Sequence, residues 1–144
     1  GTVSAASAGS ARAMIAPSLI DRLAQSGRAQ SGGAGLGPHA AALLDECLRA
    51  ARAGLPLTVV VLAAAIIDVV AHEEAGPAGH IDGMDFAYAG NKAALGWLRG
   101  RRNAILHHEG PVDGLMGEAD AASWQDRDAA RAIEALAAYL EDLV

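Results

Sequence analysis

The chain has 144 residues, about half of them apolar and few of them aromatic, which suits a single domain with a core of Ala, Leu, Val and Ile. Its formal net charge of −6 argues against a protein that coats nucleic acid non-specifically, although a local basic site is still compatible with it. The single cysteine, Cys47, excludes an internal disulfide and suits a reducing compartment, the cytoplasm; because it lies on an apolar helical stripe, we expect a core thiol.

The N-terminal segment, residues 1–38, is expected to contain a flexible arm, a short helix and a Gly-rich linker. Residues 1–13 are small and of low complexity, which predicts the arm. A helix is predicted to begin at Pro17, because proline suits the first helical position, and to end near Arg28. Residues 26–38 include five glycines, a composition typical of a linker or loop.

Four longer helices are predicted to form the domain over residues 39–144. Their expected ranges are 39–53, 56–74, 91–108 and, after an N-cap at Ser123, the rest of the chain. Asp126, three residues after Ser123, resembles the second half of a capping box. A long loop over 76–90 and a shorter one over 110–120 separate the last three helices. Because no alternating run predicts a strand, the expected fold is all-α: an antiparallel bundle of four main helices with an N-terminal helical extension.

The most apolar segment, Leu55 to Ala71, contains only Pro56, Thr58 and Asp68 as interruptions. It is slightly short for a bilayer, and a carboxylate well inside it would be costly there, so no membrane association is predicted. We expect a central helix of a soluble bundle, buried all round. A lone carboxylate in such a run costs several kcal/mol or takes up a proton, so Asp68 needs a partner on a neighbouring helix.

A second charge interrupts the helix predicted over 91–108. At about 100° per residue, four residues form one apolar stripe, Leu95, Leu98, Ile105 and Leu106. Arg102 falls near the middle of that stripe, and its guanidinium cannot lose its proton, so it needs a partner. We predict a contact of Asp68 with Arg102 or Asn103. Residue physics alone leaves open whether this contact serves a function or only fixes helix register.

The end of the same helix displays Asn103 and His107 beside Arg102. His107 lies one turn after Asn103, at the last turn before Gly110. A titratable imidazole, a fixed cation and an amide at one helix end suit proton transfer and anion stabilisation. The alternative is a histidine that only interacts favourably with the helix dipole.

The pattern Arg102-Asn103-x-x-x-His107 resembles the motif of the HEPN superfamily, in which an arginine and a polar residue are followed, after a short spacer, by a histidine. The order of elements is similar as well over roughly residues 39–144: an apolar helix with an acidic residue, a loop, the motif helix and a last amphipathic helix. The motif can also be counted from Arg101 or to His108. Arg102 and His107 are preferred because Asn103 supplies the expected polar residue.

The resemblance implies a helical bundle that forms homodimers, with the motifs of two subunits lining one cleft. In active members it implies RNA cleavage without metal or cofactor. By that analogy Arg102 stabilises the charged phosphate and His107 acts as general base or acid. Asn103 positions one of these groups, and Asp68 holds Arg102 or Asn103. Many members are toxins or phage-defence nucleases, which implies an antitoxin or regulatory protein as a further partner.

Two other functional classes remain open. Some members of the superfamily are inactive, so the alternative to an endoribonuclease is a non-catalytic nucleotide- or protein-binding module. A third possibility is a purely structural domain in which an Asp68–Arg102 pair fixes helix register. The acidic charge of the whole chain favours these classes over RNA binding.

Basic and metal-binding residues give weaker signals. Lys92, Arg99 and Arg101 form a basic cluster with Arg102 and are candidate RNA contacts; a solvated helix end is the alternative. His72, together with His107 and His108, is a candidate metal ligand. No metal site is predicted, because the spacing gives no HExxH pair and adjacent residues do not share a helix face.

Overall fold

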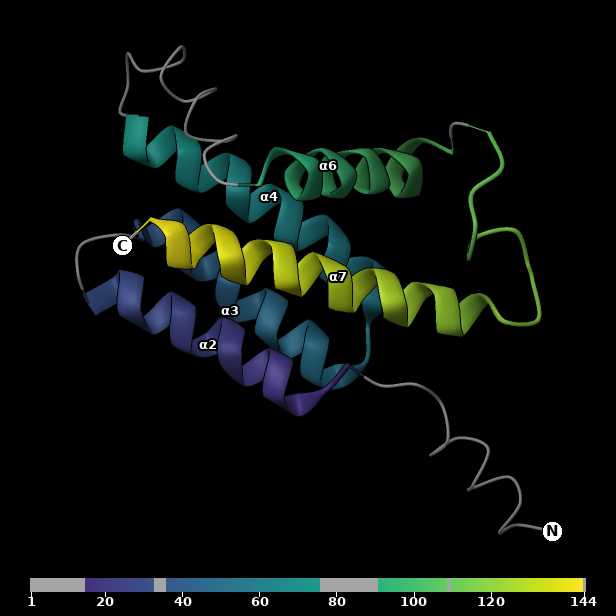
Figure 1. Ribbon diagram of the computed structural model, residues 1–144, viewed down its shortest axis with the longest axis horizontal. Helices are drawn as coiled ribbons and strands as arrows, with labels where there is room; N and C mark the ends of the chain where they lie inside the picture. The colour runs from purple at the N-terminus through teal and green to yellow at the C-terminus, as the bar shows by residue number, and fades with distance from the viewer. Residues whose placement is uncertain (1–14, 33–35, 76–90, 109, 144) are drawn as a thin grey trace, which may run out of the picture.

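The computed structural model describes residues 15–32, 36–75, 91–108 and 110–143, and every regular element in those ranges is a helix. The helices follow in chain order as α2 (Pro17–Gly32), α3 (Pro38–Ala53), α4 (Pro56–Ala75), α6 (Lys92–His107) and α7 (Ala121–Asp142) (Figure 1). The predicted all-α class is therefore confirmed. The predicted arm over 1–13 and the loop over 76–90 lie outside the described residues.

The core is centred on α4 and α7. Helix α4 packs against α3, α6 and α7, and α7 also packs against α2. The last helix, expected to be amphipathic, buries Ile133, Leu136, Ala137 and Leu140. Cys47 of α3 is fully buried as predicted, and burial raises the pKa of its thiol to about 12.

Helix α4 is buried on one side rather than all round. Its 18-residue window Pro56–Glu73 is long and apolar enough to cross a membrane, and half of that window is buried inside the protein. Val61, Ala65 and Val69 follow one another at helical spacing on the opposite side and are half-buried. This pattern suits a core helix of a soluble protein, with one apolar face incompletely covered by the described helices.

The N-terminal segment differs most from its prediction, because α2 continues to Gly32 where a linker was expected from residue 26. Gly27 lies inside the helix at a close approach to α3, where an added methyl group would clash with Leu44. Gln30 is buried and donates a hydrogen bond from Nε2 to the carbonyl of Leu140 at 2.7 Å. Gly27 therefore allows α2 to pack closely on α3, and Gln30 bonds α2 to α7.

Helix α2 belongs to the same core as the other helices. Ile20 and Leu23 are buried in the common apolar cluster, and Arg22 and Ser26 both bond the carboxylate of Glu141 on α7. The segment up to residue 32 is thus packed against α3 and α7. The physical reason is that the apolar face of α2 covers α7.

Two details of α6 and α7 differ from the sequence pattern. Helix α7 begins at Ala121 with Asp120 as its N-cap residue, and Asp126 is buried instead of completing a capping box with Ser123. Leu106, predicted within the buried stripe of α6, is 55% exposed. Figure 1 shows α6 diverging from α4 toward the C-terminal end of α6, the end that contains residue 106.

If α2 is part of the core, replacing Leu23 by alanine should lower the free energy of unfolding by about 2–5 kcal/mol, the usual range for a buried leucine. Leu23 is fully buried. The measurement is urea unfolding followed by circular dichroism, with Leu55→Ala as the control because Leu55 is 50% exposed. Equal effects of the two substitutions would mean that α2 contributes nothing to the core.

Candidate functional site

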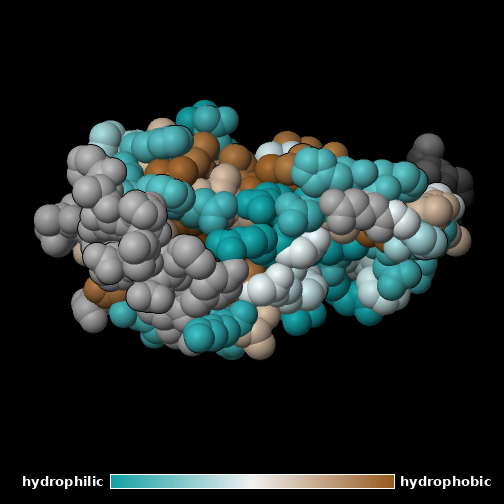
Figure 2. Space-filling view, turned by 90° about the horizontal axis from the view of Figure 1, so that it is seen from above, coloured by the Kyte–Doolittle hydropathy of each residue, from teal (hydrophilic) through white to brown (hydrophobic). Residues whose placement is uncertain are grey.

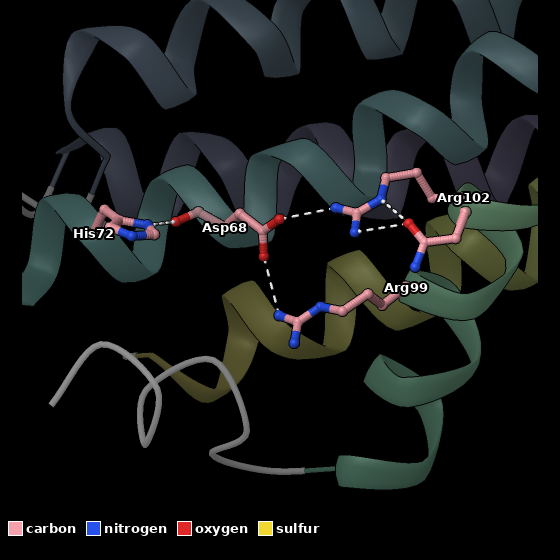
Figure 3. A network of polar contacts seen from close by, with 5 residues as sticks. Asp68, His72, Arg99 and Arg102 are labelled. Atoms are coloured by element: carbon pink, nitrogen blue, oxygen red, sulfur yellow. Dashed lines mark hydrogen bonds and ion pairs between the residues drawn. The ribbon is translucent and has the colours of Figure 1, made fainter. Parts of the chain in front are cut away.

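Asp68 of α4 is the centre of a polar network with α6 (Figure 3). Its Oδ2 accepts a hydrogen bond from Nη1 of Arg102 at 2.9 Å, which confirms the predicted Asp68–Arg102 contact. Its Oδ1 accepts from Nη2 of Arg99 at 3.0 Å. Each carboxylate oxygen therefore holds one arginine.

Asn103 contacts Arg102 instead of Asp68. Its Oδ1 accepts hydrogen bonds from Nε and Nη2 of Arg102 at 3.2 and 3.1 Å. These two bonds and the bond to Asp68 use three of the five guanidinium N–H groups of Arg102 within the described part of the chain. The guanidinium plane is thus oriented by two side chains, and these bonds leave one N–H on each of Nη1 and Nη2 unused among the described residues.

The spacing on α6 explains why both arginines reach one aspartate. Arg99 and Arg102 are three residues apart, so they lie on the same side of the helix. Long side chains on a helix project toward its N-terminus, and α6 runs opposite to α4 (Figure 1). Both guanidinium groups are therefore carried back along α6 to the level of Asp68.

The network is half-exposed. The exposed fractions of the side chains are 36% for Asp68, 35% for Arg99 and 21% for Arg102. Asp68, expected from the sequence to lie in an apolar interior, lies at the edge of the α4–α6 contact. The cost of placing a charge there is correspondingly smaller, and the arginines are accessible from solvent.

His72 joins the network one helical turn after Asp68. Its Nδ1 lies 2.7 Å from the main-chain oxygen of Asp68. Because a carbonyl oxygen only accepts, Nδ1 carries the proton and the solvent-exposed ring presents Nε2. From the sequence, His72 is a candidate for metal binding only; its i,i+4 spacing from Asp68 is the signal that points to this placement.

His107 and His108 are exposed at the C-terminal end of α6. His107 is the last helical residue, and His108 follows it in the left-handed conformation with φ of 50°. The helix rises about 7.5 Å from Arg102 to His107, while the side chain of Arg102 extends the other way to Asp68. The structure does not bring His107 or His108 into the Asp68 network within one chain.

The residues of the predicted basic cluster, Lys92, Arg99, Arg101 and Arg102, do not lie together in one site. Nε of Arg101 donates to Oδ2 of Asp128 on α7 at 2.6 Å, and its Nη2 donates to the carbonyl of Asp113. The Arg101 and Asp128 side chains are only 12% and 17% exposed. Lys92 is the exposed first residue of α6, about 15 Å along the helix from Arg102. Only Arg99 and Arg102 share a site.

Metal-ligating groups do not converge in the part of the chain that the structure describes. Within it, no three side chains from His, Cys, Asp and Glu lie close enough to hold a metal ion. Asp68 itself is engaged by two arginines, which occupy both of its oxygens. The chemistry of the described site is therefore that of guanidinium, carboxylate, amide and imidazole groups.

If the Asp68–Arg102 pair is half-exposed, a double-mutant cycle with Asp68→Ala and Arg102→Ala should give a coupling free energy of about 0.5–1 kcal/mol. The cycle is measured by chemical unfolding of the parent, the two single variants and the double variant. A coupling of about 3 kcal/mol or more would instead indicate a pair shielded from water.

Because Arg101 is nearly buried against Asp128, Arg101→Ala should destabilise the protein by about 1–3 kcal/mol, leaving a carboxylate without its partner. Arg49→Ala is the matched control, since Arg49 pairs with Asp45 on the exposed side of α3. Its effect should stay within about 0.5 kcal/mol. Equal melting temperatures for the two variants would show that Arg101 has no structural role.

Comparisons with known proteins give no relative of this chain. No family model, curated protein or solved structure matches it. The residues and contacts of the chain itself, above all the Asp68 network, are therefore what indicates a function.

Proposed function

We propose that the chain is a HEPN-like, metal-independent endoribonuclease that acts as a homodimer in the cytoplasm, in the manner of a toxin or phage-defence effector. One observation carries this proposal: Asp68 and Asn103 hold the Arg102 guanidinium in a fixed orientation at a half-exposed position. A guanidinium held in this way is suited to binding the oxygens of a phosphodiester.

The reaction proposed is a transesterification that needs no metal. A histidine takes the proton of a ribose 2′-hydroxyl, and the 2′-oxygen forms a bond to phosphorus. The bond from phosphorus to the 5′-oxygen of the next nucleotide breaks, and that oxygen receives a proton from an acid. Arg102 stabilises the negative charge that builds up on the non-bridging oxygens. The products are a cyclic 2′,3′-phosphate and a free 5′-hydroxyl.

In this proposal His107 supplies the acid or base. Because His107 lies beyond Arg102 at the end of α6, it would serve the Arg102 of a second subunit across a dimer cleft. An interface is supported by the half-buried Val61, Ala65 and Val69 on α4 and by the exposed Leu106. Figure 2 shows hydrophobic residues beside hydrophilic ones on the face seen from above, on the side of α4 and α6. An antitoxin or regulatory protein is the further partner proposed.

A non-catalytic nucleotide- or protein-binding module is the second candidate. It is favoured by the observation that Arg99, Arg101 and Arg102 each bond a carboxylate of the chain itself. In that case the Asp68 network fixes the position of α6 on α4, and the net charge of −6 selects partners other than RNA.

The test is cleavage of several RNAs by the purified protein in the presence of a chelator. Arg102→Ala and His107→Ala should each reduce the rate by about 100-fold or more, the usual contribution of a charge stabiliser or a general acid–base group. Arg49→Ala is the control and should cleave like the parent. All variants are first checked for helicity and for dimerisation by analytical ultracentrifugation. Absence of cleavage by the folded parent would favour the binding module.

A further inference from the structure

Two arginines of α7 are held by tryptophan rings. The guanidinium carbon of Arg127 lies 4.5 Å from the centroid of the Trp124 ring, and that of Arg131 lies 4.1 Å from the centroid of the Trp97 ring on α6. Trp97 packs against the apolar core, and Nε1 of Trp124 donates to Asp120 at 3.1 Å. Both rings are half-buried and both arginines are exposed, so each ring supports a cation at the surface.

This support differs from that of the other positioned arginines. Five arginines of the described chain each bond a carboxylate of the chain itself, namely Arg22, Arg49, Arg99, Arg101 and Arg102. Among the described residues, no carboxylate bonds Arg127 or Arg131. A carboxylate offsets the charge of a guanidinium and occupies its N–H groups, whereas an aromatic ring does neither to a comparable extent. Arg127 and Arg131 therefore keep their charge and their donors while a ring limits their motion.

The two ring-held arginines lie in one row on α7. They are four residues apart, so they share one side of the helix and are about 6 Å apart along its axis. Asp128, which lies between them in the sequence, is bonded by Arg101 of α6 and is nearly buried. The next exposed carboxylate on α7, Glu134, lies almost one turn beyond Arg131. The charge that the row presents to solvent is therefore positive.

We propose that this Trp–Arg row, which consists of Trp97, Trp124, Arg127 and Arg131, binds the backbone of a single-stranded RNA. A guanidinium offers pairs of N–H donors that match the oxygens of a phosphate, and a nucleobase can stack on its plane. Arginines combined with aromatic rings are typical of surfaces that bind single strands. This inference deepens the proposed function and rests on it for the identity of the ligand.

The Trp–Arg row is separate from the Asp68 network. It uses the side of α6 that faces α7, where Trp97 meets Arg131, whereas Arg102 is bonded to Asp68 on α4. The row is therefore expected to set the affinity for RNA. The rate of the chemical step at saturating RNA should depend on Arg102 and not on the row.

The test measures binding of a fluorescein-labelled single-stranded RNA decamer without terminal phosphates, by fluorescence anisotropy at several salt concentrations. Arg127→Gln and Arg131→Gln should each weaken binding about tenfold and reduce the magnitude of the salt-dependence slope by about 0.7. Arg28→Gln removes the same charge from an exposed position on α2 and should change the affinity by less than about twofold. All variants are first checked for helicity.

A second measurement needs no substitution. The chain contains two tryptophans, and both belong to the Trp–Arg row. Because an RNA bound to the two arginines changes the surroundings of both rings, the unlabelled decamer should change the intrinsic tryptophan fluorescence of the parent over the same concentration range as the anisotropy. Anisotropy that rises while the tryptophan fluorescence stays constant would place the RNA elsewhere and overturn the inference.

Cleavage of the same RNA in chelator separates this inference from the proposed function. Cleavage with a raised KM and an unchanged kcat in Arg127→Gln and Arg131→Gln supports both. Binding that depends on the two arginines without cleavage supports the row and overturns the nuclease. Cleavage by the parent, with RNA affinity unchanged in both variants or equally reduced in Arg28→Gln, overturns the row and leaves the nuclease standing. Tighter binding of a decaglutamate peptide than of the RNA overturns RNA as the ligand. Absence of both binding and cleavage by the folded parent overturns both proposals.

Discussion

The carboxylate of Asp68 is the interaction on which the position of α6 depends. Helix α6 contributes only Leu95 and Leu98 as buried residues, far fewer than α7, so apolar packing alone constrains it weakly. Asp68 holds it on the α4 side, and Arg101 ties it to Asp128 on the α7 side. A helix attached by directional polar bonds has a defined register even where its apolar contact is small.

In this attachment the Arg102 guanidinium that holds α6 on α4 is also the group proposed for function. Under the proposed function, a phosphate bound by Arg102 shares this guanidinium with Asp68. The unused N–H groups of Arg102 allow such sharing without breaking the tie between the helices. Under the proposed function, little rearrangement is needed to bind the anion, because the side chain of Arg102 is already held by Asp68 and Asn103 in the free protein.

Local patterns predicted the helical class, the limits of α3, α4 and α6 to within a residue or two, and the Asp68–Arg102 pair. That pair could be predicted because each charge interrupts an apolar stripe, and unpaired buried charges are costly. The position of Gly27 inside α2 could not be predicted, because it depends on the approach of Leu44 from α3. The exposure of Leu106 could not be predicted either, because it depends on how α6 lies relative to α4. Arg99 bonds Asp68 and Arg101 bonds Asp128, and this difference likewise depends on where the two aspartates lie in space.

The bonds between α2 and the end of α7 have a consequence for biosynthesis. Gln30 and Arg22 bond residues of α7 that lie more than a hundred positions later in the chain. During translation the side of α2 that packs on α7 therefore has no partner until α7 leaves the ribosome, and this part of the bundle can close only then. Until then α2 depends on α3, its nearer neighbour, to shield Ile20 and Leu23 from association with other nascent chains.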